Sequence, residues 1–162
     1  MKLYVMRHGP AEDAAASFHD FDRALTVKGR KRTREIARAL HHAGESPRLI
    51  IASPLVRAVQ TAEIVASVLE PDEAPVVRQE LAPGGDLPAL VQELLEAHAK
   101  SVMLVGHEPD LSALLDHLLN GKWDRPVQKA MVIGLRLDAS HHDRLRFILD
   151  PKSLQLEHLD LT

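Results

Sequence analysis

Many apolar residues of this chain stand in short unbroken runs. The stretches between these runs carry apolar residues at helical spacing. Unbroken apolar runs of about four to eight residues are typical of strands that are buried on both faces of a sheet. We expect strands at residues 2–8, 49–52, 75–80, 101–105, 131–137 and 144–148. The last two are expected to complete the sheet as an antiparallel pair.

Between the runs, apolar residues recur three and four positions apart, as in amphipathic helices. Thr26 can cap a helix that ends at Gly44, and Ser53 and Pro54 can open a second one as cap and first-turn proline. The expected buried faces are Gly29, Thr33, Ile36, Ala37 and Leu40 in the first helix, and Leu55, Val59, Ala62, Ala66 and Leu69 in the second. Two more helices are expected, one after a turn at residues 83–86 and one at residues 111–119.

Strands that alternate with helices predict an α/β fold. We expect a single three-layer domain over residues 1–162, with a mostly parallel central sheet and helices on both faces. The polar, Ala-rich stretch at residues 9–25 is expected to be a long loop or lid. In such sheets ligands bind beyond the carboxyl ends of the strands, so the residues at those ends are the candidates for chemistry.

The composition of the chain excludes several classes of function and argues against others. The chain has no cysteine, which excludes disulfides, zinc–thiolate sites and thiol catalysis. No apolar run approaches the ~18 residues of a membrane span, and the opening run stops at Arg7, too early for a secretory signal. A net charge of −3 and 3% aromatic residues argue against a nucleic-acid partner. We therefore expect a cytoplasmic protein with no membrane partner.

The expected carboxyl ends of the strands collect charged and polar residues from four separate segments: Arg7, His8, Gly9, Arg57, His107 and Glu80. Arginine suits phosphate because its planar guanidinium donates two parallel hydrogen bonds, and a helix N-terminus adds backbone donors for the same anion. A glycine beside the nucleophile lets the chain turn with little steric demand. In the absence of cysteine, His8 is the best nucleophile available.

The same positions resemble the histidine phosphatase superfamily, also called phosphoglycerate-mutase-like. The resemblance rests on Met6-Arg7-His8-Gly9, Ala24-Leu25-Thr26-Val27-Lys28-Gly29, Ser53-Pro54-Leu55-Val56-Arg57-Ala58-Val59-Gln60-Thr61-Ala62 and Val105-Gly106-His107, in the family's order. The short length and the segments 80–86 and 106–109 are similar to SixA-type phosphohistidine phosphatases. The resemblance implies that His8 becomes phosphorylated, that Arg7, Arg57 and His107 hold the phosphoryl oxygens, and that neither metal nor cofactor is needed. We place Gly9 in the same phosphate-binding group.

To attack phosphorus, His8 must be neutral, which needs little change from its ordinary pKa of ~6.5. Two flanking guanidiniums disfavour a second positive charge on the ring. The same cations stabilise the charge on the transferring phosphoryl oxygens. A positioned water then hydrolyses the phosphorylated His8.

The leaving group separates two classes of substrate. An ester releases an alkoxide, which needs an acid, whereas phosphohistidine can leave as neutral imidazole. Glu80 lies about where ester-cleaving relatives carry an acid, so it keeps small phosphate monoesters open as an alternative. The short loops leave little room to enclose a small substrate and predict an open, shallow site. The preferred partner is therefore a protein of the histidine-phosphotransfer type, and a non-catalytic phosphate-binding module is the alternative of another class.

Several other residues receive an interpretation. Arg23 is a second candidate for reaching substrate from the loop, and Glu108 is interpreted as an acid favoured at a helix start. A basic run is interpreted as a solvated helix face that can also steer anionic partners: Lys28, Arg30, Lys31, Arg32 and Arg34. The pairs His41-His42 and His141-His142 lack metal-binding spacing and are expected to face solvent.

Overall fold

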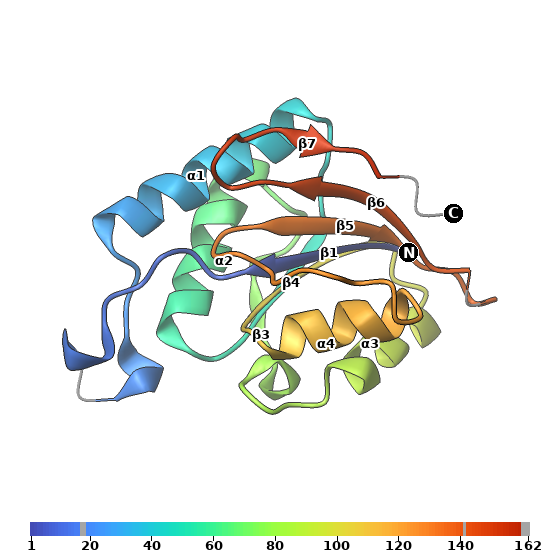
Figure 1. Ribbon diagram of the computed structural model, residues 1–162, viewed down its shortest axis with the longest axis horizontal. Coiled ribbons are helices and arrows are strands. Elements are labelled where there is room, and N and C mark those ends of the chain that lie inside the picture. Colours follow the sequence, from blue (N-terminus) through green and yellow to red (C-terminus); the bar gives the residue numbers. More distant parts are fainter. Residues whose placement is uncertain (17–18, 141, 160–162) are drawn as a thin grey trace.

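The computed structural model describes residues 1–16, 19–140 and 142–159, and its centre is a seven-stranded sheet in the order β3-β2-β4-β1-β5-β6-β7 (Figure 1). The strands are β1 (Lys2–Arg7), β2 (Leu49–Ala52), β3 (Val76–Val77), β4 (Ser101–Gly106), β5 (Val132–Arg136), β6 (Arg144–Leu149) and β7 (Leu156–Glu157). β3, β2, β4 and β1 are parallel, whereas β5, β6 and β7 extend the sheet through antiparallel pairings. The predicted α/β fold and the antiparallel pair are confirmed.

Helices cover both faces of this sheet. They are α1 (Val27–His42), α2 (Val56–Leu69), α3 (Leu87–Glu96) and α4 (Asp110–Leu118), with short 3₁₀ turns η1 (Ala14–Ala16), η2 (Asp20–Asp22) and η3 (Gln79–Leu81). α1 and α2 pack on one face, and α3 and α4 pack on the other. No helix in the described ranges is long and apolar enough to cross a membrane.

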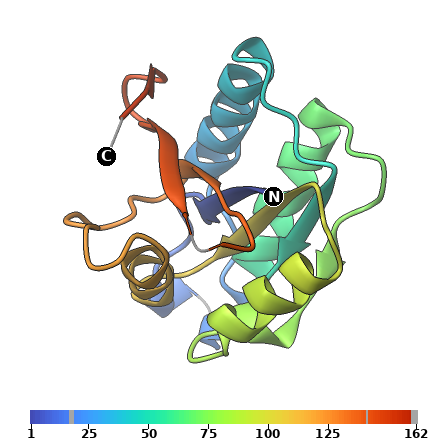
Figure 2. The ribbon, with the colours of Figure 1, turned by 90° about the vertical axis from the view of Figure 1, so that its right-hand side faces the viewer.

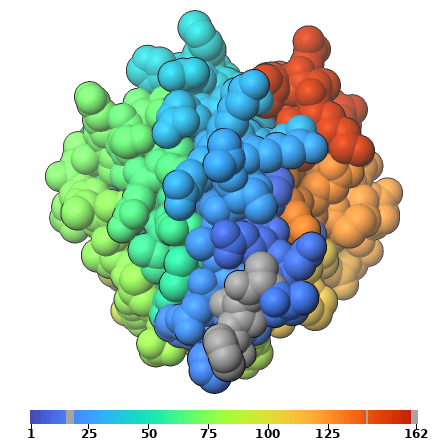
Figure 3. Space-filling model, turned by 90° about the vertical axis from the view of Figure 1, so that its left-hand side faces the viewer, coloured from blue at the N-terminus to red at the C-terminus, as the bar shows by residue number. Residues whose placement is uncertain are grey.

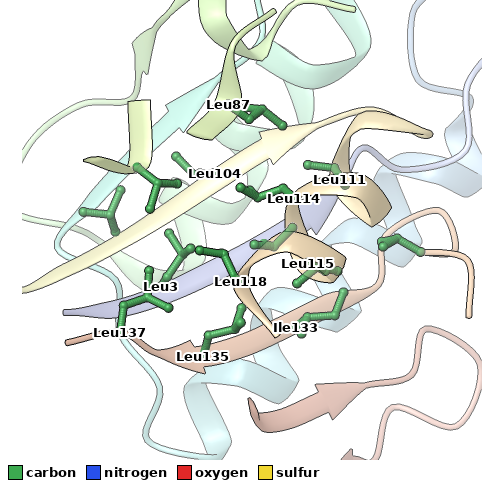
Figure 4. Packing of buried hydrophobic residues seen from close by; sticks show 14 of the residues in the cluster. Leu3, Leu87, Leu104, Leu111, Leu114, Leu115, Leu118, Ile133, Leu135 and Leu137 are labelled. Atoms are coloured by element: carbon green, nitrogen blue, oxygen red, sulfur yellow. The ribbon is translucent and has the colours of Figure 1, made fainter. Parts of the chain in front are cut away.

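Alternate residues of each strand supply two separate cores. In β1, Leu3 and Val5 point toward α3 and α4, whereas Tyr4 and Met6 point toward α1 and α2. The first core is rich in leucine, and Leu104 of the interior strand β4 lies among side chains from both helices (Figure 4). All four of the β1 residues are fully buried, so the strand that carries the predicted nucleophile is anchored from both sides.

The first predicted helix is confirmed in detail. The hydroxyl of Thr26 accepts a hydrogen bond from the Gly29 amide at 2.9 Å, and the helix is followed by Gly44 at φ 73°. The five residues predicted for its buried face are the five that are buried.

The start of the second helix was predicted wrongly. α2 begins at Val56 with Leu55 as an N-cap that makes no side-chain bond, so Ser53 is not a cap and Pro54 lies outside the helix. Its buried face is also rotated: Ala58 and Val65 are buried, whereas the predicted Val59 and Ala66 are only half-buried. The hydroxyl of Ser53 instead contacts a histidine across the sheet, as described below.

The third predicted strand is much shorter than expected. Only Val76 and Val77 pair with β2, at the exposed edge of the sheet. The chain then turns through η3, which buries Leu81 and takes Glu80 out of the strand. The two-residue strand β7 at the opposite edge carried too little pattern to be predicted.

Candidate active site

The carboxyl ends of β1 and β4 bring two histidines together. Because Arg7 pairs with Gly106 in the parallel ladder, the next residues, His8 and His107, leave adjacent strands side by side. Their ring centroids are 5.3 Å apart, and both residues are buried. Figure 3 views the molecule from this end, and the loop that follows β1 lies across the face.

The imidazole of His8 is oriented by its own neighbour. Its Nδ1 lies 2.7 Å from the carbonyl oxygen of Gly9, and because a carbonyl only accepts, Nδ1 carries the proton. The lone pair therefore resides on Nε2. Burial lowers the pKa of His8 to about 3. The bond to Gly9 opposes this shift, and His107, Arg57 and Arg7 add to it. At neutral pH the ring is uncharged and Nε2 is a free nucleophile.

His107 is held by a residue that the sequence interpretation assigned to a helix cap. The Oγ of Ser53 lies 2.7 Å from Nε2 of His107 and accepts a hydrogen bond from the Leu55 amide at 3.2 Å. The hydroxyl proton can therefore point at Nε2, which leaves the ring proton on Nδ1. Burial, followed by the charge of Arg57, lowers the pKa of His107 to about 4, so this ring is also neutral.

Three buried donors at this end of the sheet have no hydrogen-bond partner among the described residues: Arg7 Nε, Arg57 Nε and His107 Nδ1. An unsatisfied buried donor is costly, roughly 1–3 kcal/mol for a neutral group and more for a charged one. Residues from β1, α2 and the turn after β4 supply them. A tetrahedral oxyanion placed among these groups would satisfy all three.

Arg57 also binds the loop that follows β1. Its Nη1 donates to the Asp20 carbonyl at 2.7 Å, and its Nη2 donates to the Asp20 carboxylate at 3.0 Å. These contacts occupy the end of the guanidinium. The side edge, formed by Nε–H and the second hydrogen of Nη2, keeps two parallel donors for an oxyanion.

The loop covers the site more closely than expected. Arg23, a candidate for reaching substrate from the loop, donates from Nε to the Asp20 carboxylate at 2.9 Å and from Nη1 to the Glu12 carbonyl at 2.9 Å. The exposed fractions of His8, Arg57 and His107 are 5%, 4% and 4%. The expectation of an open, shallow site is therefore wrong for this structure, because Asp20 ties η2 onto Arg57.

Gly9 acts through close packing. A Cβ at this position would lie 2.5 Å from Thr33 Oγ1 and 3.1 Å from the Gly29 carbonyl oxygen. The Gly9 amide donates to Thr61 Oγ1 at 3.1 Å, so it is engaged with α2 and not directed at a phosphate. Gly9 therefore positions the strand end that carries the nucleophile.

Glu80 is engaged in a surface ion pair. Its carboxylate accepts from Nε and Nη2 of Arg78 at 3.2 and 2.7 Å, and Arg78 also binds Glu93. The Arg78 bonds lower the pKa of Glu80, so the group is ionised at neutral pH. This state is unsuited to donating a proton to a leaving group.

Glu108 connects the start of α4 to the segment that contacts Arg7. Its carboxylate accepts from the amide and hydroxyl of Ser112 in α4, at 2.9 and 2.7 Å. It also accepts from the Val127 amide at 3.3 Å, and the carbonyl of Val127 receives Nη1 of Arg7 at 3.1 Å. Glu108 therefore fixes the backbone segment that orients Arg7.

The remaining candidates lie outside this cluster. The basic run on α1 is exposed apart from the half-buried Arg32, as predicted for a solvated face. His41, His42 and His142 are exposed, and His141 lies outside the described residues. Within those residues, no group of three or more histidine or carboxylate side chains could hold a metal ion. The sequence interpretation missed Ser53, Thr61 and Asp20, and only Ser53 and Thr61 lie in a quoted motif.

Comparison with known proteins agrees with this geometry. The model of the histidine phosphatase superfamily (branch 1) matches residues 3–82. The chain is 30% identical to phosphohistidine phosphatase SixA of Escherichia coli, over 96% of this chain and 98% of that protein. It is 41% identical to an uncharacterised protein of Picosynechococcus, over 95% and 99% of the two chains.

A solved structure is similar over its whole length. The protein histidine phosphatase SixA complexed with tungstate superposes with a TM-score of 0.88 at 28% identity, covering 96% of this chain and 100% of that one. The full-length similarity in sequence and in structure and the arrangement of His8, His107 and the two arginines thus support the same assignment. The chain belongs to the histidine phosphatase superfamily and is a phosphatase.

Proposed function

We propose that this phosphatase hydrolyses phosphohistidine on a protein, with Nε2 of His8 as the nucleophile that carries the phosphoryl group. The observation that carries the proposal is the 2.7 Å contact between His8 Nδ1 and the Gly9 carbonyl, which leaves the lone pair on Nε2. The lowered pKa of His8 keeps that lone pair available. A protonated ring could not attack phosphorus.

In the first step, Nε2 of His8 forms a bond to phosphorus while the bond from phosphorus to the substrate nitrogen breaks. The side edge of Arg57, the Nε–H of Arg7 and the Nδ1–H of His107 donate to the phosphoryl oxygens as charge develops on them. In the second step, water attacks phosphorus and the bond to Nε2 breaks. The water proton ends on the released phosphate, and His8 returns to its neutral form.

The state of Glu80 supports an N-phosphate as substrate. A substrate histidine that is protonated at its other nitrogen leaves as neutral imidazole, so no acid is needed. An ester would need one, and the Glu80 carboxylate is ionised and bound by Arg78. The similarity to a phosphohistidine phosphatase of Escherichia coli favours the same choice.

Two alternatives predict different behaviour. A phosphatase for small phosphate monoesters would hydrolyse such esters efficiently and would need a proton donor other than Glu80. A non-catalytic phosphate-binding module would bind phosphate but form no covalent intermediate. We also place the enzyme in the cytoplasm as part of this proposal, on the cysteine-free composition given above.

The test compares a phosphohistidine peptide and a phosphorylated histidine-phosphotransfer protein with a small phosphate ester. We expect faster turnover of the N-phosphates and acid-labile phosphate trapped on the enzyme. His8→Ala should abolish the trapped phosphate, and His41→Ala, which removes an exposed histidine, should not. Efficient ester hydrolysis without phosphohistidine turnover would overturn the substrate, and trapped phosphate on His8→Ala would overturn the nucleophile.

A further inference from the structure

A cavity of about 690 Å³ lies at the amino ends of β1 and β4, at the opposite end of the sheet from His8. Figure 2 views this end, with the amino terminus near the centre. The cavity is lined by the charged side chains of Lys2, Arg48, Lys100, Arg136 and Asp138, together with the exposed His98. Met1, whose amino group donates to the Leu137 carbonyl, also lines it. Four cationic side chains thus face one carboxylate, in a chain whose net charge is −3.

The sheet register sets three of the cations of this region in a row. Lys2 of β1 lies directly opposite Arg136 of β5, and Arg136 lies directly opposite Arg144 of β6. Directly opposed residues share a face of the sheet, and neighbouring strands are ~4.8 Å apart. Like charges in this position destabilise a sheet. The row therefore has an electrostatic cost that a bound anion would remove.

Two carboxylates lie near these cations: Asp138 lines the cavity, and Glu45 interacts electrostatically with Lys2. Within the described ranges, Lys2, Lys100, Arg136 and Arg144 form no ion pair. Arg48 pairs with Asp72 at 3.9 Å, with side chains 68% and 74% exposed, and a pair of that kind contributes little.

Arg136 also borders a second cavity. This cavity has a volume of about 320 Å³ and is lined by Arg144 and Arg146 as well. Arg146 is bound by Glu45, but Arg144 is in no ion pair within the described part of the chain. Positive charge therefore continues from the first cavity across β5 and β6.

We infer that this end of the sheet binds a small anion that carries several phosphate groups. The volume of the larger cavity falls within the roughly 300–1,000 Å³ of ordinary ligand sites. Cations on three adjacent strands can contact more than one phosphate, which a single orthophosphate could not exploit. The site is separate from the histidine cluster and does not depend on the proposed substrate.

The test uses tripolyphosphate as the probe and Arg57→Ala as the background, because that change weakens anion binding at the histidine cluster. Titration calorimetry should detect saturable binding, with a much weaker response to orthophosphate. Adding Arg136→Gln should raise the dissociation constant about tenfold, in line with one lost charged contact. Arg34→Gln, which makes the same change on the exposed face of α1, should leave it unchanged.

Thermal unfolding gives a second readout that a folding defect could not imitate. Without the probe, Arg136→Gln should melt at the same temperature as its parent or higher, because one like-charge contact is gone. With saturating tripolyphosphate the order should reverse, since a ligand that binds the folded state raises the melting temperature. Absence of binding on the Arg57→Ala background, or binding that Arg136→Gln leaves unchanged, would overturn the proposal.

Discussion

The hydroxyl oxygen of Ser53 lies 2.7 Å from Nε2 of His107, although the two residues are 54 positions apart in the chain. Ser53 follows β2 and His107 follows β4, and these strands are neighbours in the sheet. When the Ser53 hydroxyl donates to Nε2, the ring proton of His107 is on Nδ1. In that arrangement Nδ1 can donate to a phosphoryl oxygen.

Replacing Ser53 by alanine should lower kcat about tenfold and change KM much less. Without the hydroxyl, His107 can place its proton on Nε2 and turn the Nδ1 lone pair toward the phosphoryl oxygens. Loss of a whole oxyanion donor costs about 10²–10³ in kcat, and a partial loss should cost less. Ser53→Thr keeps the hydroxyl and should restore most of the rate. Equal rates in wild type and Ser53→Ala would contradict this role.

Replacing Asp20 by alanine should raise KM and the inhibition constant of inorganic phosphate, each roughly tenfold. The reason is that Nη2 of Arg57 loses the Asp20 carboxylate, so that only the bond from Nη1 to the backbone carbonyl of residue 20 is left to hold its side edge toward His8. Asp22→Ala changes an exposed carboxylate in the same 3₁₀ turn and is the matched control. If phosphate bound more tightly to Asp20→Ala, the carboxylate would be a competitor of the substrate and not a positioning residue.

The free energy of unfolding should fall as the pH drops from about 6.5 toward 4. Burial lowers the pKa of His8 to about 3 and of His107 to about 4, so the unfolded chain takes up protons that the folded one does not. Each histidine can contribute at most about 1.4 kcal/mol per pH unit in this window, and nothing above it. Urea unfolding at pH 7 and pH 5 should show a smaller pH effect in His8→Asn. An identical pH effect would mean that His8 titrates normally in the folded state.

Gly9→Ala should destabilise the protein by about 1–3 kcal/mol and reduce activity. The added Cβ would lie 2.5 Å from Thr33 Oγ1, and relief of this contact would move the strand end that carries His8. Combining it with Thr33→Ala should recover part of the stability, because the closest atom is removed. Recovery should be incomplete, since the Gly29 carbonyl remains at 3.1 Å. Chemical denaturation of the two single variants and the double variant measures the coupling.

Glu80→Gln should leave the hydrolysis rate of phosphohistidine within about twofold of wild type. The carboxylate is bound by Arg78 and ionised, so its removal takes no proton donor from the reaction. A much larger loss for esters than for N-phosphates would restore Glu80 as an acid for ester substrates. Side-by-side kinetics on both substrate types distinguish these outcomes.

The position of the main site residues follows from local sequence and one rule of sheet geometry. Arg7 and His8 end an apolar run, and His107 follows another, so a parallel pairing of those runs brings them together. α1 was predictable because its cap and its buried stripe are both local features. The strand order itself could not be read from the apolar pattern, because several pairings bury the same residues.

The contacts that tune the site depend on tertiary structure. Serine is a residue type that commonly caps helices, yet the hydroxyl of Ser53 contacts a histidine that follows a neighbouring strand. Asp20 is one of several acids in a polar loop, and nothing local distinguishes it from Asp22. Only the folded chain shows which of the two reaches Arg57.

The guanidinium of Arg57 links the position of the loop to the binding of an oxyanion. One end holds the loop through Asp20, and the side edge faces the histidines, so closure of the loop and capture of an oxyanion are linked equilibria. By reciprocity, whatever factor closure adds to anion affinity, the anion adds to closure. Orthovanadate or phosphate should therefore slow amide hydrogen exchange at residues 19–25, and the Asp20→Ala change, which removes the bond to Nη2, should weaken this effect.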